Sequence, residues 1–126
     1  MASNLNTGLQ GEEVACRYLR DKGYRIIERN YRCDHFEIDI IAEYGCSIVF
    51  CEVKTARTNK FGPSVTWVTP QKIKHIATAA NEYIATHDTG SCSFRFDVIG
   101  IEVIDGKIRI NHIENAFDAP EDMDER

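Results

Sequence analysis

The sequence predicts an α/β domain with a mixed central β-sheet and flanking helices, in the order α-β-β-β-α-β-β. Two stretches with helical spacing of apolar residues and five short runs rich in β-branched and aromatic residues support this order. A chain of 126 residues suffices for one hydrophobic core and not for two. We therefore expect a single domain over residues 1–117, followed by a disordered acidic tail over residues 118–126.

The first helix is predicted over residues 6–23, where apolar residues recur at helical spacing and Gly23 provides a helix C-terminus. The position between Leu9 and Cys16 on this apolar stripe is Glu12. A carboxylate on a core-facing stripe costs free energy unless a cation, a proton or a hydrogen-bond donor meets it. Glu12 is therefore interpreted either as a site residue or as a carboxylate bonded to a backbone amide.

Three strands are predicted next, over residues 24–31, 36–42 and 47–55. Residues 43–46 have the composition of a hairpin turn between the second and third of them. Alternation along the third strand places Glu52 and Lys54 on the face that also carries Ile48 and Phe50. The opposite face carries Val49, Cys51 and Val53, so this strand is predicted to be central and covered on both faces.

The second helix is predicted to begin with Thr69 as its N-cap and Pro70 at its first position. Two further strands, over residues 94–103 and 107–113, surround a predicted turn at Asp105 and Gly106. The core-facing stripe of the helix is expected to consist of Ile73, Ile76, Ala77, Ala80 and Ile84.

Charge is distributed unevenly along the chain. The net charge is −5, but residues 118–126 carry five acids and one arginine, so the remaining residues sum to −1. The stretch from residue 53 to residue 81 has no acid and five basic residues, which are Lys54, Arg57, Lys60, Lys72 and Lys74. Such a local positive surface attracts phosphates, and a solvated lysine face is the alternative interpretation.

Neither a membrane segment nor a disulfide framework is expected. No apolar run approaches the roughly 18 residues that span a bilayer, and residues 1–6 are polar, so we expect a cytoplasmic protein with no membrane partner. The five cysteines form no CxxC pair and are interpreted as reduced, small apolar residues.

The strongest chemical signal is a pair of carboxylates on neighbouring strands. If the hairpin is centred between Gly45 and Cys46, Asp39 faces Glu52 with Cβ atoms about 4.5–5.5 Å apart, a distance at which like charges destabilise a strand pair. A divalent cation such as Mg²⁺ would remove that repulsion, with Lys54 beside it on the same face. A buried ion triad of the three residues is the alternative.

This arrangement resembles the active site of the PD-(D/E)XK nuclease superfamily, which has an acid on one strand and (D/E)-x-K on the next. Most of the chain also resembles the YraN-type family, an uncharacterised endonuclease-like group similar to archaeal Holliday junction resolvases. One departure is Asp34-His35-Phe36, where that family commonly has a glycine. The matching stretches are Gly8-Leu-Gln-Gly11-Glu12-Glu-Val-Ala15 with Tyr18-Leu19, Glu37-Ile-Asp39-Ile-Ile-Ala42, Val49-Phe-Cys-Glu52-Val-Lys54-Thr55, Phe61-Gly62, Val68-Thr-Pro-Gln-Lys72, Arg95-Phe96-Asp97 and His112-Ile-Glu-Asn-Ala-Phe117.

The resemblance implies a restriction-endonuclease-like fold and a metal-dependent nuclease that hydrolyses phosphodiester bonds of DNA. It also suggests branched or otherwise structured DNA as the substrate and a homodimer as the assembly. It implies that Asp39, Glu52 and the Val53 carbonyl bind Mg²⁺, with Mn²⁺ as a substitute. Lys54 would orient or activate the attacking water, and Glu12 would reach the metal through a water. Nucleic-acid contacts are assigned to Arg57, Lys60, Gln71, Lys72 and Lys74.

A second hypothesis is a catalytically inactive nuclease-fold module that binds nucleic acid or protein. The acidic tail and the negative net charge favour it, because a catalytic nuclease usually has a broader basic surface. Asp97 is interpreted as closing a turn or pairing with a neighbouring strand, and the four histidines as ordinary surface or partly buried residues.

Overall fold

The computed structural model describes residues 7–56 and 68–120 of the chain. Its elements follow the predicted order, and the predicted α/β class with a mixed sheet is confirmed. The helices and strands are α1 (Thr7–Asp21), β1 (Arg25–Cys33), β2 (Phe36–Tyr44), β3 (Ser47–Ala56), α2 (Pro70–Thr86), β4 (Ser93–Ile104) and β5 (Lys107–Ile113).

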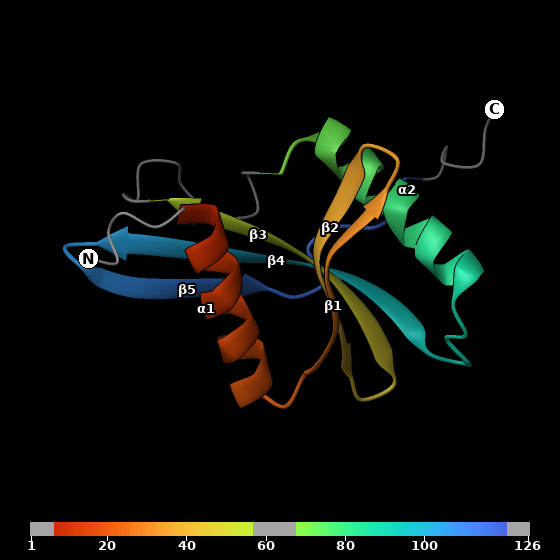
Figure 1. Cartoon of the computed structure of the whole chain (residues 1–126), viewed down its shortest axis with the longest axis horizontal. Coiled ribbons are helices and arrows are strands. Elements are labelled where there is room, and N and C mark those ends of the chain that lie inside the picture. The colour runs from red at the N-terminus through yellow and green to blue at the C-terminus, as the bar shows by residue number, and fades with distance from the viewer. Residues whose placement is uncertain (1–6, 57–67, 121–126) are drawn as a thin grey trace.

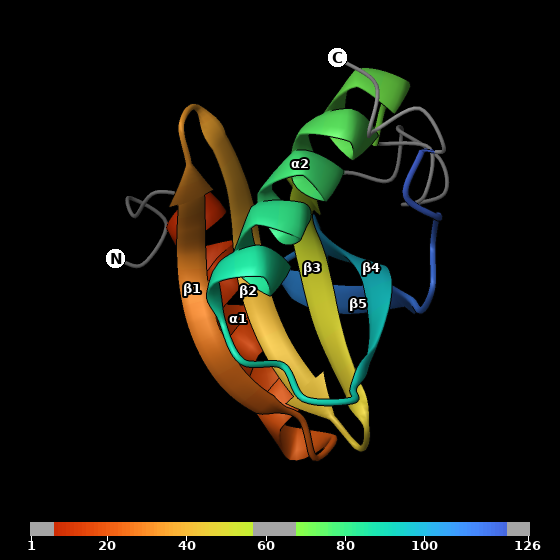
Figure 2. The same cartoon turned by 90° about the vertical axis from the view of Figure 1, so that its right-hand side faces the viewer.

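One five-stranded sheet forms the centre of the molecule, with the strands in the order β1-β2-β3-β4-β5 (Figure 1). Neighbouring strands are antiparallel except β3 and β4, which are parallel and are connected through α2. Figure 2 shows α2 in front of the sheet and α1 behind it. Neither of these two helices has the length and apolar content needed to cross a membrane.

Each face of the sheet has its own hydrophobic core, as the predicted alternation along β3 requires. Ile48 and Phe50 of β3 belong to the core beneath α2, whereas Val49 and Cys51 belong to the core beneath α1. The α2 core also contains Ile38, Ile41, Ile76, Ala79, Ala80, Tyr83 and Val98, and the α1 core contains Ala15, Cys16, Leu19, Ile40, Ile99 and Ile101.

The predicted C-terminal motif of α1 and the predicted N-cap of α2 are confirmed. Gly23 has φ +96°, and the N–H groups of Gly23 and Tyr24 donate to the carbonyls of Arg20 and Leu19, which is the hydrogen-bond pattern of a Schellman motif. Thr69 caps α2 by accepting a hydrogen bond of 3.2 Å from the Lys72 N–H. Both ends therefore satisfy backbone groups that a helix leaves unpaired.

The predicted core stripe of α2 needs a correction. Ile76, Ala77 and Ala80 are buried as expected, but Ile73 and Ile84 are only partly buried. Both isoleucines still pack against the core beneath α2, and Ala79 and Tyr83 are buried in addition. The strongly twisted sheet turns beneath the helix, so the covered side of α2 is broader than a single narrow stripe.

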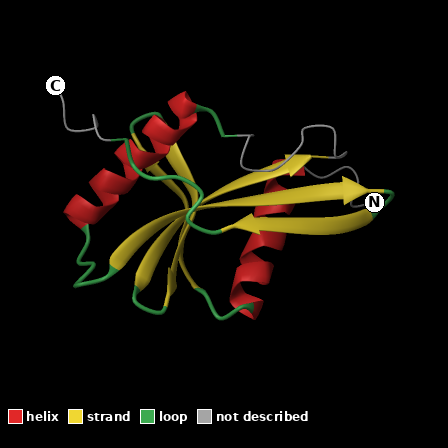
Figure 3. Ribbon diagram, turned by 180° about the vertical axis from the view of Figure 1, so that it is seen from behind, coloured by secondary structure: helices red, strands yellow, loops and turns green. Residues whose placement is uncertain are grey.

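The sheet opens between β2 and β3 at one end. Residue pairs from Tyr44↔Ser47 to Ile40↔Cys51 follow the predicted register, and the ladder ends there, one pair short of Asp39 and Glu52. Beyond that point β2 continues with β1, while β3 continues with β4, as Figure 3 shows by strands that cross at the centre and spread apart on both sides. The predicted carboxylate pair thus lies where two halves of the sheet separate.

A glycine brings α1 close to this opening. Gly11 is buried, and a Cβ atom at this position would overlap the hydroxyl of Thr55 and lie 3.4 Å from its Cβ. Only a residue without a side chain therefore allows α1 to approach β3 so closely. This contact places Glu12, the next residue of α1, near the end of β3.

We expect Gly11→Ala to destabilise the fold despite the better helix propensity of alanine. Alanine in a helix gains about 1 kcal/mol over glycine, but overpacking costs about 1–3 kcal/mol, so the free energy of unfolding in urea should fall. Adding Thr55→Ala removes the overlapping hydroxyl and should restore much of the loss. A Gly11→Ala variant more stable than the wild type would contradict this close packing.

Candidate functional site

Asp39 is held at the point where β2 leaves β3. Its Oδ2 accepts a hydrogen bond of 2.8 Å from the backbone N–H of Val53. The carboxylate thereby takes the place of a backbone acceptor beyond the end of the ladder. The Val53 N–H is satisfied, and the Asp39 carboxylate is fixed beside Glu52.

Glu52 is a buried carboxylate with one unpartnered oxygen. The residue is 3% exposed, its Oε2 lies 3.5 Å from Nζ of Lys72, and its Oε1 has no hydrogen-bond partner. Burial first and the neighbouring Asp39 charge second raise the pKa of Glu52 to about 7, although Lys72 and Lys54 act in the opposite direction. Lys54 keeps its predicted place, two residues beyond Glu52 on the same strand.

Asp39 and Glu52 are electrostatically linked. Burial raises the pKa of Asp39 and is opposed by the Val53 N–H and by the charge of Lys72, while Glu37 adds to the rise. A hydrogen bond with the Glu52 carboxyl also favours the ionised form of Asp39. The two carboxylates therefore converge as predicted, through their side chains and not through a ladder pair, and full ionisation of both is costly.

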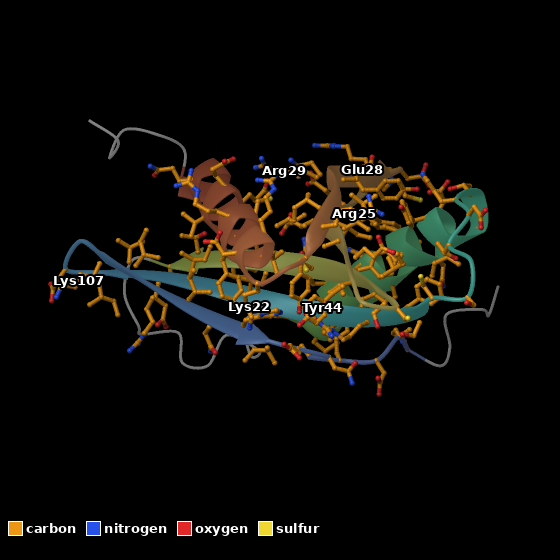
Figure 4. The ribbon with its side chains drawn as sticks, turned by 90° about the horizontal axis from the view of Figure 1, so that it is seen from below. Lys22, Arg25, Glu28, Arg29, Tyr44 and Lys107 are labelled. Atoms are coloured by element: carbon orange, nitrogen blue, oxygen red, sulfur yellow. The ribbon has the colours of Figure 1, made fainter. Side chains whose placement is uncertain are left out.

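Glu12 reaches the same cluster from α1. Burial and the charge of Asp39 raise its pKa, while Asn30, which hydrogen-bonds to it through its side chain, lowers it. Its Oε1 is buried without a partner and lies 3.9 Å from the guanidinium of Arg29, which is beside α1 in Figure 4. One hydrogen-bond partner of Glu12 is thus the Asn30 side chain.

Unsatisfied polar atoms are concentrated in this cluster. Within residues 7–56 and 68–120, the buried side-chain polar atoms without a hydrogen-bond partner are Glu12 Oε1, Arg29 Nε and Glu52 Oε1. Native proteins leave few buried polar atoms unpaired, and such atoms call for an explanation. Two of the three are carboxylate oxygens of residues that feel the charge of Asp39, and carboxylate oxygen is the ligand type that hard divalent cations select.

The donor set fits a cation that retains water ligands and does not fit a closed cage. No group of three or more His, Cys, Asp or Glu side chains in the described parts of the chain is arranged to hold a metal ion. Asp39 and Glu52 together supply two carboxylates, and Mg²⁺ is commonly bound through one or two carboxylates with several waters. Glu12 is not arranged with Asp39 and Glu52 as a third metal ligand, so its contact with the metal through a water stays a prediction.

The predicted nucleic-acid residues do not all join this cluster. Lys72 lies in it, as the ion-pair partner of Glu52. Gln71 instead hydrogen-bonds to His75 at 2.8 Å, and Lys74 is exposed on α2. Arg57 and Lys60 lie outside the described residues.

The sequence analysis missed two members of the cluster, Arg29 and Asn30. Arg29 lies within ion-pair distance of both Glu12 and Glu13. Asn30 adopts φ +55° within β1, a conformation that non-glycine residues seldom adopt. An asparagine inside a strand is the only sequence signal that pointed to this irregularity.

A second buried acid, Asp97, provides a contrast because both of its carboxylate oxygens have hydrogen-bond partners. Arg95 donates two hydrogen bonds of 2.9 Å, His112 lies 2.7 Å away and the Asn115 N–H donates at 3.0 Å. Burial raises the pKa of Asp97, but the hydrogen bonds from His112, Arg95 and Asn115 outweigh it and hold that pKa below its usual value. Asp97 therefore pairs with Arg95 of its own strand and with His112 of the neighbouring strand β5.

A surface groove lies elsewhere on the molecule, between α1 and β5. None of the predicted site residues that the structure describes lines it. Its walls are formed by Gln10, Glu13, Val14, Arg17, Tyr18, Asp21, Ile108 and Ile110. The candidate site is consequently defined by its buried charges and not by the size of a cavity.

The fold and the site define an α/β protein whose mixed sheet opens onto a carboxylate cluster flanked by lysines. Residues 11–101 match the family described as "Uncharacterised protein family UPF0102", and the chain belongs to that family. This membership confirms the predicted resemblance to the uncharacterised YraN-type family.

Relatives named "UPF0102 protein" match nearly the whole chain. The protein of Syntrophomonas wolfei is 46% identical over 114 residues, which cover 90% of this chain and 99% of the relative. The protein of Syntrophus aciditrophicus is 43% identical over 118 residues, covering 94% and 93%. That of Pelobacter propionicus is 45% identical over 118 residues, covering 91% and 84%.

The raised pKa of Glu52 predicts that stability falls as pH rises in metal-free buffer. Because Glu52 holds a proton up to about pH 7 in the fold but only to about 4.5 in a free side chain, the folded state binds more protons between these values. The loss is at most about 1.4 kcal/mol per pH unit. Thermal melts from pH 5 to pH 8 should show a fall in Tm that Glu52→Gln makes shallower.

The control for this measurement is Glu102→Gln. Glu102 is also buried, but Arg109 donates to it at 2.8 Å. This variant should keep the pH profile of the wild type. An equally steep fall in Glu52→Gln would show that another group causes the pH dependence.

Proposed function

We propose that this protein is a metal-dependent nuclease that hydrolyses phosphodiester bonds of DNA through the carboxylate cluster. The observation that carries the proposal is the convergence of Asp39, Glu52 and Lys54 at the opening between β2 and β3, with an unpartnered buried oxygen on Glu52. A buried ion triad selected for stability would be expected to satisfy its oxygens, because an uncompensated buried charge is destabilising.

The proposed cation would use carboxylate and carbonyl oxygens, the ligands that hard divalent cations prefer. Asp39 and Glu52 would hold it, with the Val53 carbonyl as the predicted backbone ligand and Mg²⁺ or Mn²⁺ as the candidate ions. When bound, a divalent cation of this kind polarises a phosphate and lowers the pKa of a bound water.

The side chains around this pair have separate roles in the proposal. Asp39 is oriented by the Val53 N–H. Lys54 orients the attacking water or stabilises negative charge on the phosphate. Glu12 remains close enough to influence Asp39 and is proposed to accept a hydrogen bond from a water at the site.

The proposed substrate is DNA, with branched or structured DNA suggested by the resemblance to Holliday junction resolvases. The same resemblance suggests a homodimer, and we place the protein in the cytoplasm. Lys72 of α2 lies 3.5 Å from Glu52, and Lys74 is exposed two residues further along the same helix, so both are proposed to contact phosphates of the substrate. The five bases between residues 53 and 81 support this choice of an anionic substrate.

The first test is cleavage of linear, single-stranded and four-way-junction DNA with Mg²⁺ or Mn²⁺. Glu52→Gln weakens the proposed cation site and Lys54→Met removes the group that acts on the attacking water, so each should reduce the rate by about 100-fold or more. Glu102→Gln should cleave like the wild type. Cleavage that survives both site substitutions would refute the assignment.

The second test measures the cation directly. Calorimetric titration of Mg²⁺ or Mn²⁺ should show binding to the wild type and a loss of binding in Asp39→Asn, because one of the two carboxylates becomes neutral. The matched control is Asp88→Asn, an exposed acid in the loop after α2. DNA binding together with intact metal binding and no cleavage of any substrate would favour the alternative, a nuclease-fold module that only binds.

A further inference from the structure

Lys72, in the first turn of α2, forms an ion pair with the carboxylate cluster. The N-terminus of α2 fixes its backbone, because the Lys72 N–H donates to the Thr69 side chain. Its ammonium lies 3.5 Å from Oε2 of Glu52. The charge of Lys72 also acts on Asp39, so this lysine serves both carboxylates of the proposed metal site.

The two partners of this ion pair differ in their freedom to move. The side chain of Glu52 is 4% exposed, whereas that of Lys72 is 40% exposed. Glu52 lies on β3, where its backbone pairs with Val98 of β4, and its buried side chain has little room to move. Lysine has a long flexible stem and a strongly hydrated ammonium, so Lys72 can leave Glu52 without disturbing the backbone of α2.

A divalent cation and the Lys72 ammonium would compete for the same carboxylate. Both are positive and both are attracted to Glu52, so each weakens the binding of the other. Glu52 Oε1 has no partner and Oε2 faces Lys72. A cation that uses the carboxylate therefore meets the ammonium of Lys72 within a few ångströms.

We propose that Lys72 is a displaceable counter-ion of the Asp39 and Glu52 pair, and that its ammonium moves from Glu52 to the phosphate of the substrate when the cation binds. This inference rests on the proposed function, namely a cation held by the two carboxylates. The inference adds that binding of the cation strengthens binding of the phosphate, and the reverse, because Lys72 moves from Glu52 to the phosphate. By linkage, the two binding reactions must affect each other by the same factor.

The competition predicts that removal of Lys72 strengthens cation binding in the absence of DNA. A site that is partly occupied by a competitor loses apparent affinity in proportion to that occupancy. Lys72→Met should therefore bind Mg²⁺ about tenfold more tightly than Lys74→Met by calorimetry, the expected size for an ion pair with a buried carboxylate. Lys74→Met removes the same charge from the same helix and controls for the general field of α2.

A third variant, Lys107→Met, removes a charge at the turn between β4 and β5, far from α2 in Figure 4. It should bind Mg²⁺ like the wild type. An affinity of Lys72→Met equal to or weaker than that of Lys74→Met would overturn the proposed competition, because Lys72 would then support the site and not compete for it.

The second half of the inference concerns the phosphate. Binding of a short DNA duplex, followed by fluorescence anisotropy, should be strengthened by Ca²⁺, a hard cation that also binds carboxylate oxygens. In Lys72→Met at least about fivefold of this strengthening should be lost, the lower range of measured coupling between two ligands. Equal strengthening by Ca²⁺ in the wild type and in Lys72→Met would overturn the transfer of the ammonium to the phosphate.

Failure of this inference can be distinguished from failure of the proposed function. If neither the wild type nor any variant binds Mg²⁺, the metal site itself is refuted. If the wild type binds Mg²⁺ and Asp39→Asn does not, the metal site stands and the comparison of Lys72→Met with Lys74→Met decides the role of Lys72. Thermal melts without added metal give an independent reading, since Lys72→Met should be less stable than Lys74→Met and should regain more stability on addition of Mg²⁺.

Discussion

The hydrogen bond from the Val53 N–H to the Asp39 carboxylate is the interaction on which the candidate site depends. It closes the ladder between β2 and β3 with a side chain in place of a backbone carbonyl. Since the Val53 N–H is already satisfied, the two strands can separate at this point without leaving that buried donor unpaired. The same bond holds Asp39 against Glu52, so the opening of the sheet and the crowding of negative charge have one cause.

Two buried acids of this protein, Asp97 and Glu52, differ in how completely their carboxylates are paired. Asp97 is fully buried and is surrounded by donors from Arg95, His112 and Asn115, so its ionised form is stabilised. Glu52 is equally hidden from water but has a single lysine at 3.5 Å and one oxygen without a partner. The fold has enough donors to satisfy a buried carboxylate where stability alone requires it. The incomplete satisfaction of Glu52 is thus a local property of the cluster and not a general shortage of partners.

The charges around the cluster act on one another locally, which the net charge of the chain conceals. Acids on α1, β2 and β3 meet Arg29, Lys54 and Lys72 at the opening of the sheet. Because these groups are partly withdrawn from water, each charge affects its neighbours more strongly than a surface charge would. A cation and an anionic phosphate would enter a site whose internal charges are already coupled, and this coupling gives Lys72 a role different from that of an ordinary surface lysine.

The sequence by itself determined the order of the elements, the helix ends at Gly23 and Thr69, the register of the β2–β3 hairpin and the alternation along β3. These features depend on interactions between residues close in the chain, such as caps, turns and cross-strand pairs, whose geometry is nearly the same in every protein. The sequence also indicated Glu12, from its position on an apolar helix stripe, and the pair of Asp39 and Glu52, from the hairpin register. Both predictions likewise depend on residues close in the chain. Only the tertiary structure decided that β2 and β3 separate at Asp39, that Arg29 and Asn30 approach Glu12, and that Lys72 faces Glu52. Those contacts join α1, β1, β3 and α2 across the sheet, and they follow from its twist and from the close approach at Gly11, which no local pattern specifies.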